Sequence, residues 1–115
     1  MSGNGDVLRE DEALERLGGD RDFLVELLGD LLEVAGSEIS QLREALESED
    51  EQVSIRSAHS IKGAAANLSA VRLSGIAREI EITCRDGRLK EARGMVDGLE
   101  EALEELREHL GSMED

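Results

Sequence analysis

The sequence contains no proline, no tryptophan and no tyrosine, and Phe23 is its only aromatic residue. Aromatic residues are enriched in strands and proline interrupts helices, so these shortages disfavour a sheet and favour long helices. Hydrophobic residues make up 39% of the 115 residues and charged residues 36%. This length and composition predict one all-α domain with a single modest core.

Positive charge is also scarce, since 13 lysines and arginines stand against 28 acidic residues and the net charge is −15 at pH 7. Nucleic acids and anionic membranes attract basic surfaces, so we expect neither as a partner. Cys84 is the only cysteine, which excludes an internal disulfide, and its place on an apolar stripe predicts a core residue. We find no apolar signal segment and no apolar run of about 18 residues, and therefore expect a cytoplasmic protein.

We divide the chain into a flexible N-terminal tail, one domain and a C-terminal tail, at residues 1–5, 6–112 and 113–115. A short helix is expected over residues 10–17, and Gly18 and Gly19 are suited to end it. Asp20 is expected to cap the next helix, in which Gly36 predicts a kink or a break.

Three further amphipathic segments follow. The apolar spacing predicts helices over residues 53–68, 73–84 and 89–110, the last as one long helix. Ser37 could cap a new helix after a break at Gly36. Four main amphipathic segments with short connections predict an antiparallel four-helix bundle, preceded by a short additional helix.

The segment over residues 53–68 contains the histidine that we consider functional. Its apolar residues gather on one side of the helix, and His59 falls roughly 140° from the centre of that side, so His59 is predicted to face solvent. A lone histidine is most often an ordinary solvated or core residue, but a glycine one turn later lowers helix stability by roughly 1 kcal/mol relative to alanine and needs a reason. The neighbours of His59 on this surface are Gln52, Arg56, Lys62, Gly63 and Ala66.

This combination is suited to carrying phosphate. A neutral imidazole is well populated near pH 7, and its ring nitrogen can accept a phosphoryl group. Lys62 could supply an ammonium to a group carrying nearly two negative charges, and Gly63 leaves room for that group and for a partner's backbone.

The motif "AHSIKGAAANLSA", residues 58–70, resembles the signature of histidine-containing phosphotransfer (HPt) domains of His-to-Asp phosphorelays. The segments "LERLGGDRDFLVELLGDLL" and "ARGMVDGLEEALEELREHL" are similar to the first and last long helices of that family. The resemblance implies a four-helix fold in which His59 is the phospho-accepting residue, Lys62 helps to hold the phosphoryl group and Gly63 keeps the approach open. It further implies that a receiver domain brings an aspartate and Mg²⁺, so that the chain needs no cofactor of its own.

The chain departs from the family where many members have glycine, because Ser69 follows "ANL" and could cap the next helix. It contains no ATP-binding signature, so we expect a phosphocarrier rather than a kinase. The partners implied are response-regulator receiver domains and a sensor or hybrid histidine kinase. We expect a monomeric, stand-alone carrier, and a fragment of a hybrid kinase is the alternative.

Other functions have less support. Two histidines and one cysteine predicted to lie in the core make a poor metal site. We predict that His109 is a solvated residue near the end of the last helix. The strongest competitor is a helical adaptor that binds receiver or kinase domains and never carries phosphate. We also predict that Arg56, Lys62 and Arg72 concentrate positive charge around His59 and orient a partner.

Overall fold

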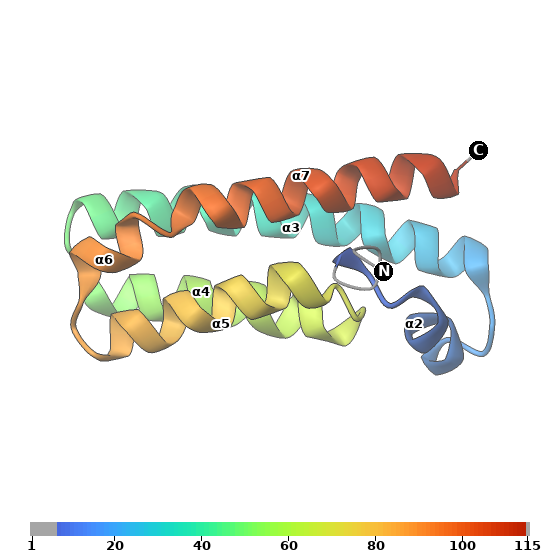
Figure 1. The fold of residues 1–115 in the computed structure, drawn as a ribbon, viewed down its shortest axis with the longest axis horizontal. Helices are drawn as coiled ribbons and strands as arrows, with labels where there is room; N and C mark the ends of the chain where they lie inside the picture. Colours follow the sequence, from blue (N-terminus) through green and yellow to red (C-terminus); the bar gives the residue numbers. More distant parts are fainter. Residues whose placement is uncertain (1–6, 115) are drawn as a thin grey trace.

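A computed structural model describes residues 7–114, in which four long helices run antiparallel (Figure 1). The long helices are α3 (Arg21–Glu47), α4 (Glu51–Asn67), α5 (Val71–Arg85) and α7 (Val96–Met113), and the short ones are α2 (Glu10–Arg16) and α6 (Leu89–Arg93). The predicted all-α, four-helix bundle with a short preceding helix is therefore confirmed. The tail predicted at residues 1–5 lies outside the described residues.

Aspartate caps begin two of the helices, and glycines end two others. Asp20 and Asp50 accept hydrogen bonds of 3.0 and 3.1 Å from backbone N–H groups in the first turns of α3 and α4. Gly18, Gly19 and Gly87 have φ angles of +69°, +83° and +79°, in the left-handed region that only glycine enters without steric cost. The starts of α3 and α4 and the ends of α2 and α5 thus follow from local chemistry.

Helix α3 continues through Gly36 without a break, and Ser37 caps no helix, so the expected break and the expected cap are both wrong. Ala35 and Ile39 on either side of the glycine are buried in the core. A helix of 27 residues that packs along its whole length outweighs the roughly 1 kcal/mol that one glycine removes. Tertiary packing therefore decides the conformation here.

The C-terminal segment is broken where the sequence predicts one long helix. Helix α6 ends at Arg93, and the chain enters α7 in a new direction after Gly94 and Met95 (Figure 1). Ala92 is fully buried, and Arg93 donates a hydrogen bond of 3.4 Å to the carbonyl of Leu46 at the end of α3. Helix α6 thereby packs against α3 and α5 and closes the end of the bundle. The apolar residues of α6 and α7 face the same core. The apolar periodicity therefore continues across the break and gives no sign of it in the sequence.

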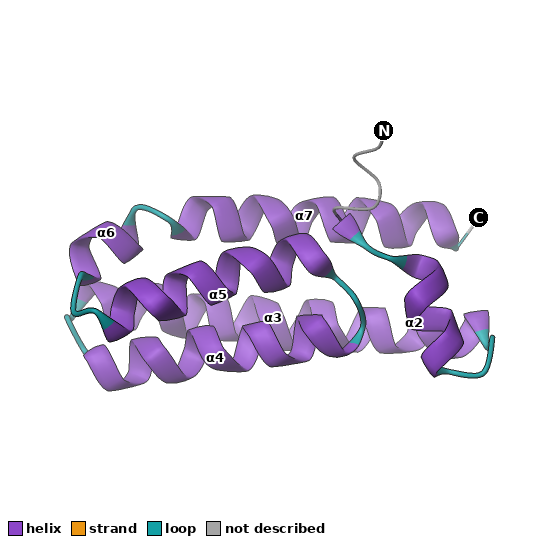
Figure 2. Cartoon of the chain, turned by 60° about the horizontal axis from the view of Figure 1, so that its bottom comes forward, coloured by secondary structure: helices purple, strands orange, loops and turns teal. Residues whose placement is uncertain are grey.

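Helix α2 lies against the turn between α4 and α5 and is hydrogen-bonded to it (Figure 2). Arg16 donates hydrogen bonds to the carbonyl of Asn67 and to the hydroxyl of Ser69, and that hydroxyl donates a bond of 2.6 Å to Glu12. The capping role predicted for Ser69 is wrong, because the N-cap of α5 is Ala70, which has no side-chain cap. Ser69 has a φ of +59°, a conformation that favours glycine, so its hydrogen bonds offset some backbone strain.

The burial pattern corrects two more expectations and confirms one. Cys84 is fully buried as predicted, and this burial raises the pKa of its thiol. Met113 is helical and buried, so α7 runs one residue past residue 112, after which we expected the C-terminal tail to begin. His109 is half-buried, with Nε2 3.4 Å from Oε1 of Glu10, rather than solvated. Among the helices described, none is long and apolar enough to span a membrane.

Candidate functional site

Helix α4 presents His59 to solvent, as its helical periodicity predicts. The His59 side chain is 60% exposed, whereas Ala58 and Ile61 beside it are buried. Lys62 is half-buried at the edge of this surface. The other predicted neighbours are exposed on α4, and we call the exposed set the His59 face: Gln52, Arg56, His59, Gly63 and Ala66.

Gly63 is not required by packing inside the molecule. A Cβ added at this position would meet no atom within 4 Å, and the residue lies within the regular helix α4. The glycine therefore lowers helix stability without relieving any internal contact. Because Gly63 has no side chain, the helix backbone is uncovered one turn beyond the imidazole.

The hairpin of α4 and α5 brings Glu81 opposite His59. The two residues are equally far in sequence from Ala70 in the connecting turn, and antiparallel neighbours place such positions side by side. Nδ1 of His59 lies 3.0 Å from Oε2 of Glu81. In the sequence alone, Glu81 resembles any other acid of an acidic chain, and its distance from the turn is the signal that points to it.

Glu81 is buried among positive groups. Its side chain is 6% exposed, and Nζ of Lys62 lies 3.0 Å from Oε1. Nη2 and Nε of Arg85 donate hydrogen bonds of 2.7 and 3.1 Å to Oε2. Burial acts to raise the pKa of Glu81, but hydrogen bonds from Arg85, Lys62 and His59 outweigh it and lower the pKa from 4.5 to about 2. The carboxylate is therefore ionised at neutral pH.

The ionised carboxylate fixes the tautomer of the histidine ring. A carboxylate can only accept hydrogen bonds, so Nδ1 of His59 must carry the proton in this contact. In the neutral ring, Nε2 then has an unprotonated lone pair. An exposed imidazole that a carboxylate holds at one nitrogen is the arrangement of an oriented nucleophile.

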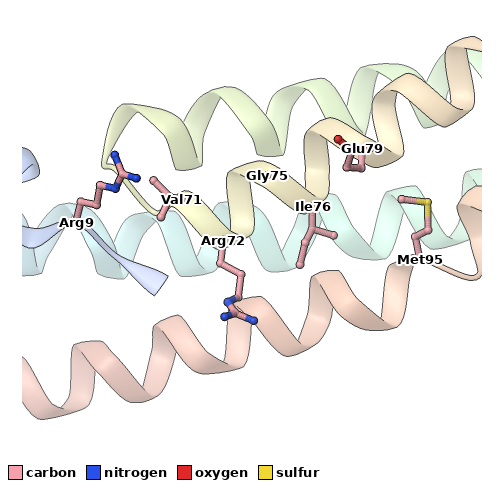
Figure 3. Close-up of a pocket in the computed structure, with 7 residues that line it drawn as sticks. All are labelled: Arg9, Val71, Arg72, Gly75, Ile76, Glu79 and Met95. Carbon is pink, nitrogen blue, oxygen red and sulfur yellow. The ribbon is translucent and has the colours of Figure 1, made fainter. Parts of the chain in front are cut away.

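Arg72 does not belong to the positive patch expected around His59. Figure 3 shows it pointing from α5 toward α7, where its Nε lies 3.2 Å from Oε1 of Glu105. It lines a groove of about 490 Å³ that also includes Ile76 and Met95. The cation that α5 contributes beside His59 is Arg85, which was not among the residues predicted from the sequence.

Comparison with known proteins identifies the family. The model of the Hpt domain matches residues 26–109. The chain belongs to the Hpt domain family. The fold of this Hpt domain is similar to the crystal structure of histidine-containing phosphotransfer protein B (HptB) from Pseudomonas aeruginosa PAO1, with a TM-score of 0.84, 25% sequence identity and coverage of 92% of each chain. No curated protein sequence matches it.

Membership in the Hpt domain family confirms the resemblance seen in the sequence. It gives the chain a histidine phosphotransfer role in phosphorelays, and Hpt domain proteins are phosphocarriers rather than kinases. Receiver domains and histidine kinases are its classes of partner. The matched range contains the whole α4–α5 hairpin of this Hpt domain, including His59 and Glu81. Within residues 7–114, no group of three or more His, Cys, Asp or Glu side chains is placed to hold a metal ion.

Proposed function

We propose that His59 accepts a phosphoryl group from the aspartate of a receiver domain, or from a kinase, and passes it to the aspartate of a response regulator in a two-component phosphorelay. One observation carries this proposal. The exposed imidazole is held at Nδ1 by Glu81, which leaves Nε2 available to a partner.

The transfer requires no base from this chain. The lone pair of Nε2 attacks the phosphorus of an aspartyl phosphate, and an N–P bond forms as the P–O bond breaks. The electrons of the broken bond leave with the partner's carboxylate. Nδ1 keeps its proton throughout, so the phosphorylated ring carries a positive charge, which the carboxylate of Glu81 stabilises. Reversal of these steps delivers the group to a second aspartate.

Lys62 is proposed to stabilise the phosphoryl group. Its ammonium lies beside the ring, 3.0 Å from the carboxylate of Glu81, and its flexible side chain can turn toward a dianionic group on Nε2. Gly63 and Ala66 leave clearance for the partner's backbone, and Gln52 and Arg56 extend the docking surface along α4.

The partner supplies the remaining chemistry. We expect a receiver domain to bring Mg²⁺ together with its aspartate, so that this chain uses no cofactor of its own. A net charge of −15 supports a protein that binds neither nucleic acid nor anionic membranes. We further propose that it acts as a monomer in the cytoplasm.

The test is incubation of the purified chain with several receiver domains that carry a radioactive aspartyl phosphate. Transfer should place acid-labile, base-stable label on the chain, and mapping should place it on His59. A His59→Gln variant should remain unlabelled under the same conditions.

The competing proposal is an adaptor that binds receiver or kinase domains without carrying phosphate. It predicts a complex by titration calorimetry but no label on His59 with any competent donor. That outcome would replace the phosphotransfer proposal.

A further inference from the structure

The carboxylate of Glu81 has more positive partners than one negative charge requires. Oε2 accepts from Nδ1 of His59 at 3.0 Å and from Nη2 of Arg85 at 2.7 Å, while Oε1 lies 3.0 Å from Nζ of Lys62. Arg85 and His59 therefore share a single oxygen. The position of the imidazole depends on where Arg85 holds that oxygen.

The two cations on Glu81 differ in the helix they come from and in the number of nitrogens that contact the carboxylate. Arg85 lies one turn after Glu81 on α5, and its Nε and Nη2 both donate to Oε2, so the planar guanidinium holds the oxygen that also accepts from His59. Lys62 comes from the other helix and offers a single flexible ammonium. Lys62 can turn away from Glu81 without disturbing α5, whereas Arg85 shares that helix with Glu81 and lies one turn from it.

This difference matters when Lys62 turns to a phosphoryl group. A carboxylate that is 6% exposed is stable as an anion only while a cation remains on it. Without Arg85, departure of Lys62 would leave Glu81 with the imidazole alone. The carboxylate would then compete with the phosphoryl group for the same ammonium.

We propose that Arg85 is a positioning residue for phosphotransfer: it holds Glu81 on Nδ1 of His59, which keeps Nε2 unprotonated and allows Lys62 to leave Glu81 for the phosphoryl group. The part that concerns the phosphoryl group rests on the proposed function. The part that concerns the tautomer of His59 does not.

Other charged groups near His59 do not replace Arg85. Arg56 lies on α4 one turn before His59 and has an exposed side chain. Glu38 of α3 accepts a hydrogen bond of 3.3 Å from the hydroxyl of Ser60 and not from the imidazole. Arg78, one turn before Glu81 on α5, lies 4.0 Å from Glu79. Arg78 is therefore a matched control for loss of one positive charge from this helix.

The experiment compares Arg85→Gln, Arg85→Lys and Arg78→Gln with the unchanged protein. Nitrogen-15 NMR of the unphosphorylated proteins reads the tautomer of His59, and single-turnover transfer from a phosphorylated receiver domain gives the rate. We expect Arg85→Gln to move the ring from mainly Nδ1–H toward Nε2–H, and to slow transfer about tenfold. Arg85→Lys should restore part of both effects, and Arg78→Gln should change neither.

Each result separates the two proposals. An unchanged tautomer in Arg85→Gln overturns the positioning role, whether or not phosphate is transferred. Equal slowing by Arg78→Gln and Arg85→Gln also overturns it, since general charge would then explain the rate. If no protein accepts phosphate while the tautomer still shifts in Arg85→Gln, the proposed function fails and the positioning of His59 stands.

Discussion

The ammonium of Lys62 lies 3.0 Å from the buried carboxylate of Glu81, so the residue proposed to hold the phosphoryl group is already paired in the unphosphorylated protein. The phosphoryl group must therefore attract Lys62 away from an existing ion pair. Lys62 therefore lies near His59 both before and after phosphorylation. Before phosphorylation, the carboxylate of Glu81 neutralises part of the positive charge that Lys62 would otherwise expose.

Replacement of His59 with glutamine should abolish phosphorylation and leave the fold intact. The side chain is mostly exposed, so its loss removes little packing, although Glu81 loses one hydrogen-bond donor. Labelling by a phosphorylated receiver domain and far-ultraviolet circular dichroism test the two parts. His109→Gln is the control and should remain fully phosphorylated, because His109 lies on α7, contacts Glu10 of α2 and is not part of the His59 face.

Replacement of Lys62 with alanine should slow transfer about tenfold and lower the free energy of unfolding by about 1–2 kcal/mol. The rate falls because the phosphoryl group loses its cation. The stability falls because Glu81 is buried and loses one of its partners. Single-turnover transfer and urea unfolding measure the two effects.

Lys90→Ala is the control for this change, since Lys90 is the only other lysine and lies on the exposed side of α6. Neither its transfer rate nor its stability should change measurably. A Lys62→Ala protein that transfers phosphate at the normal rate would contradict the role given to Lys62.

Much of the fold follows from short-range signals in the sequence. The caps Asp20 and Asp50 and the glycines at positive φ set the ends of helices because each satisfies a local requirement of the backbone. The outward direction of His59 follows from apolar spacing within α4 alone. These features depend on a few neighbouring residues, which a sequence displays directly.

The features that sequence reasoning missed depend on contacts between helices. Gly36 stays helical because α3 packs along its whole length, and α6 turns away from α7 to close the bundle. Glu81 and Arg85 become part of the site only once α5 lies beside α4. Arg72 points to α7, and nothing in the local sequence of α5 reveals that direction.

Replacement of Gly63 with glutamine should stabilise the protein by about 0.5–1 kcal/mol and slow transfer at least about tenfold. The open space around its Cβ means that a side chain fits within the monomer, so helix propensity sets the sign of the stability change. The same side chain would stand on the His59 face, where a partner must approach. Thermal unfolding and single-turnover transfer test this pair of opposite effects.

Gly75→Gln provides the matched comparison. Gly75 is also exposed within a helix and has open space around its Cβ, but it lines the groove between α5 and α7. It should gain similar stability and keep its transfer rate. Equal activity of the Gly63→Gln and Gly75→Gln proteins would refute the clearance argument.

The ion pairs of Glu81 should make the stability of the protein depend on pH. Hydrogen bonds lower the pKa of this carboxyl from 4.5 to about 2 in the folded state, despite its burial. A group with a lowered pKa stabilises the fold fully above its unfolded value, and the stabilisation disappears as pH falls through the folded value. Glu81 should thus contribute about 3 kcal/mol at neutral pH, lost between pH 4.5 and 2.

The measurement is urea unfolding of the unchanged protein and of Glu81→Gln from pH 7 to pH 3. Other carboxylates titrate in both proteins, so the difference between the two free energies isolates Glu81. This difference should be largest near pH 7 and shrink steadily below pH 4.5, because protonation removes the negative charge that glutamine already lacks. A difference that stays constant across this range would mean that the three cationic and donor groups around Glu81 do not hold it as an anion.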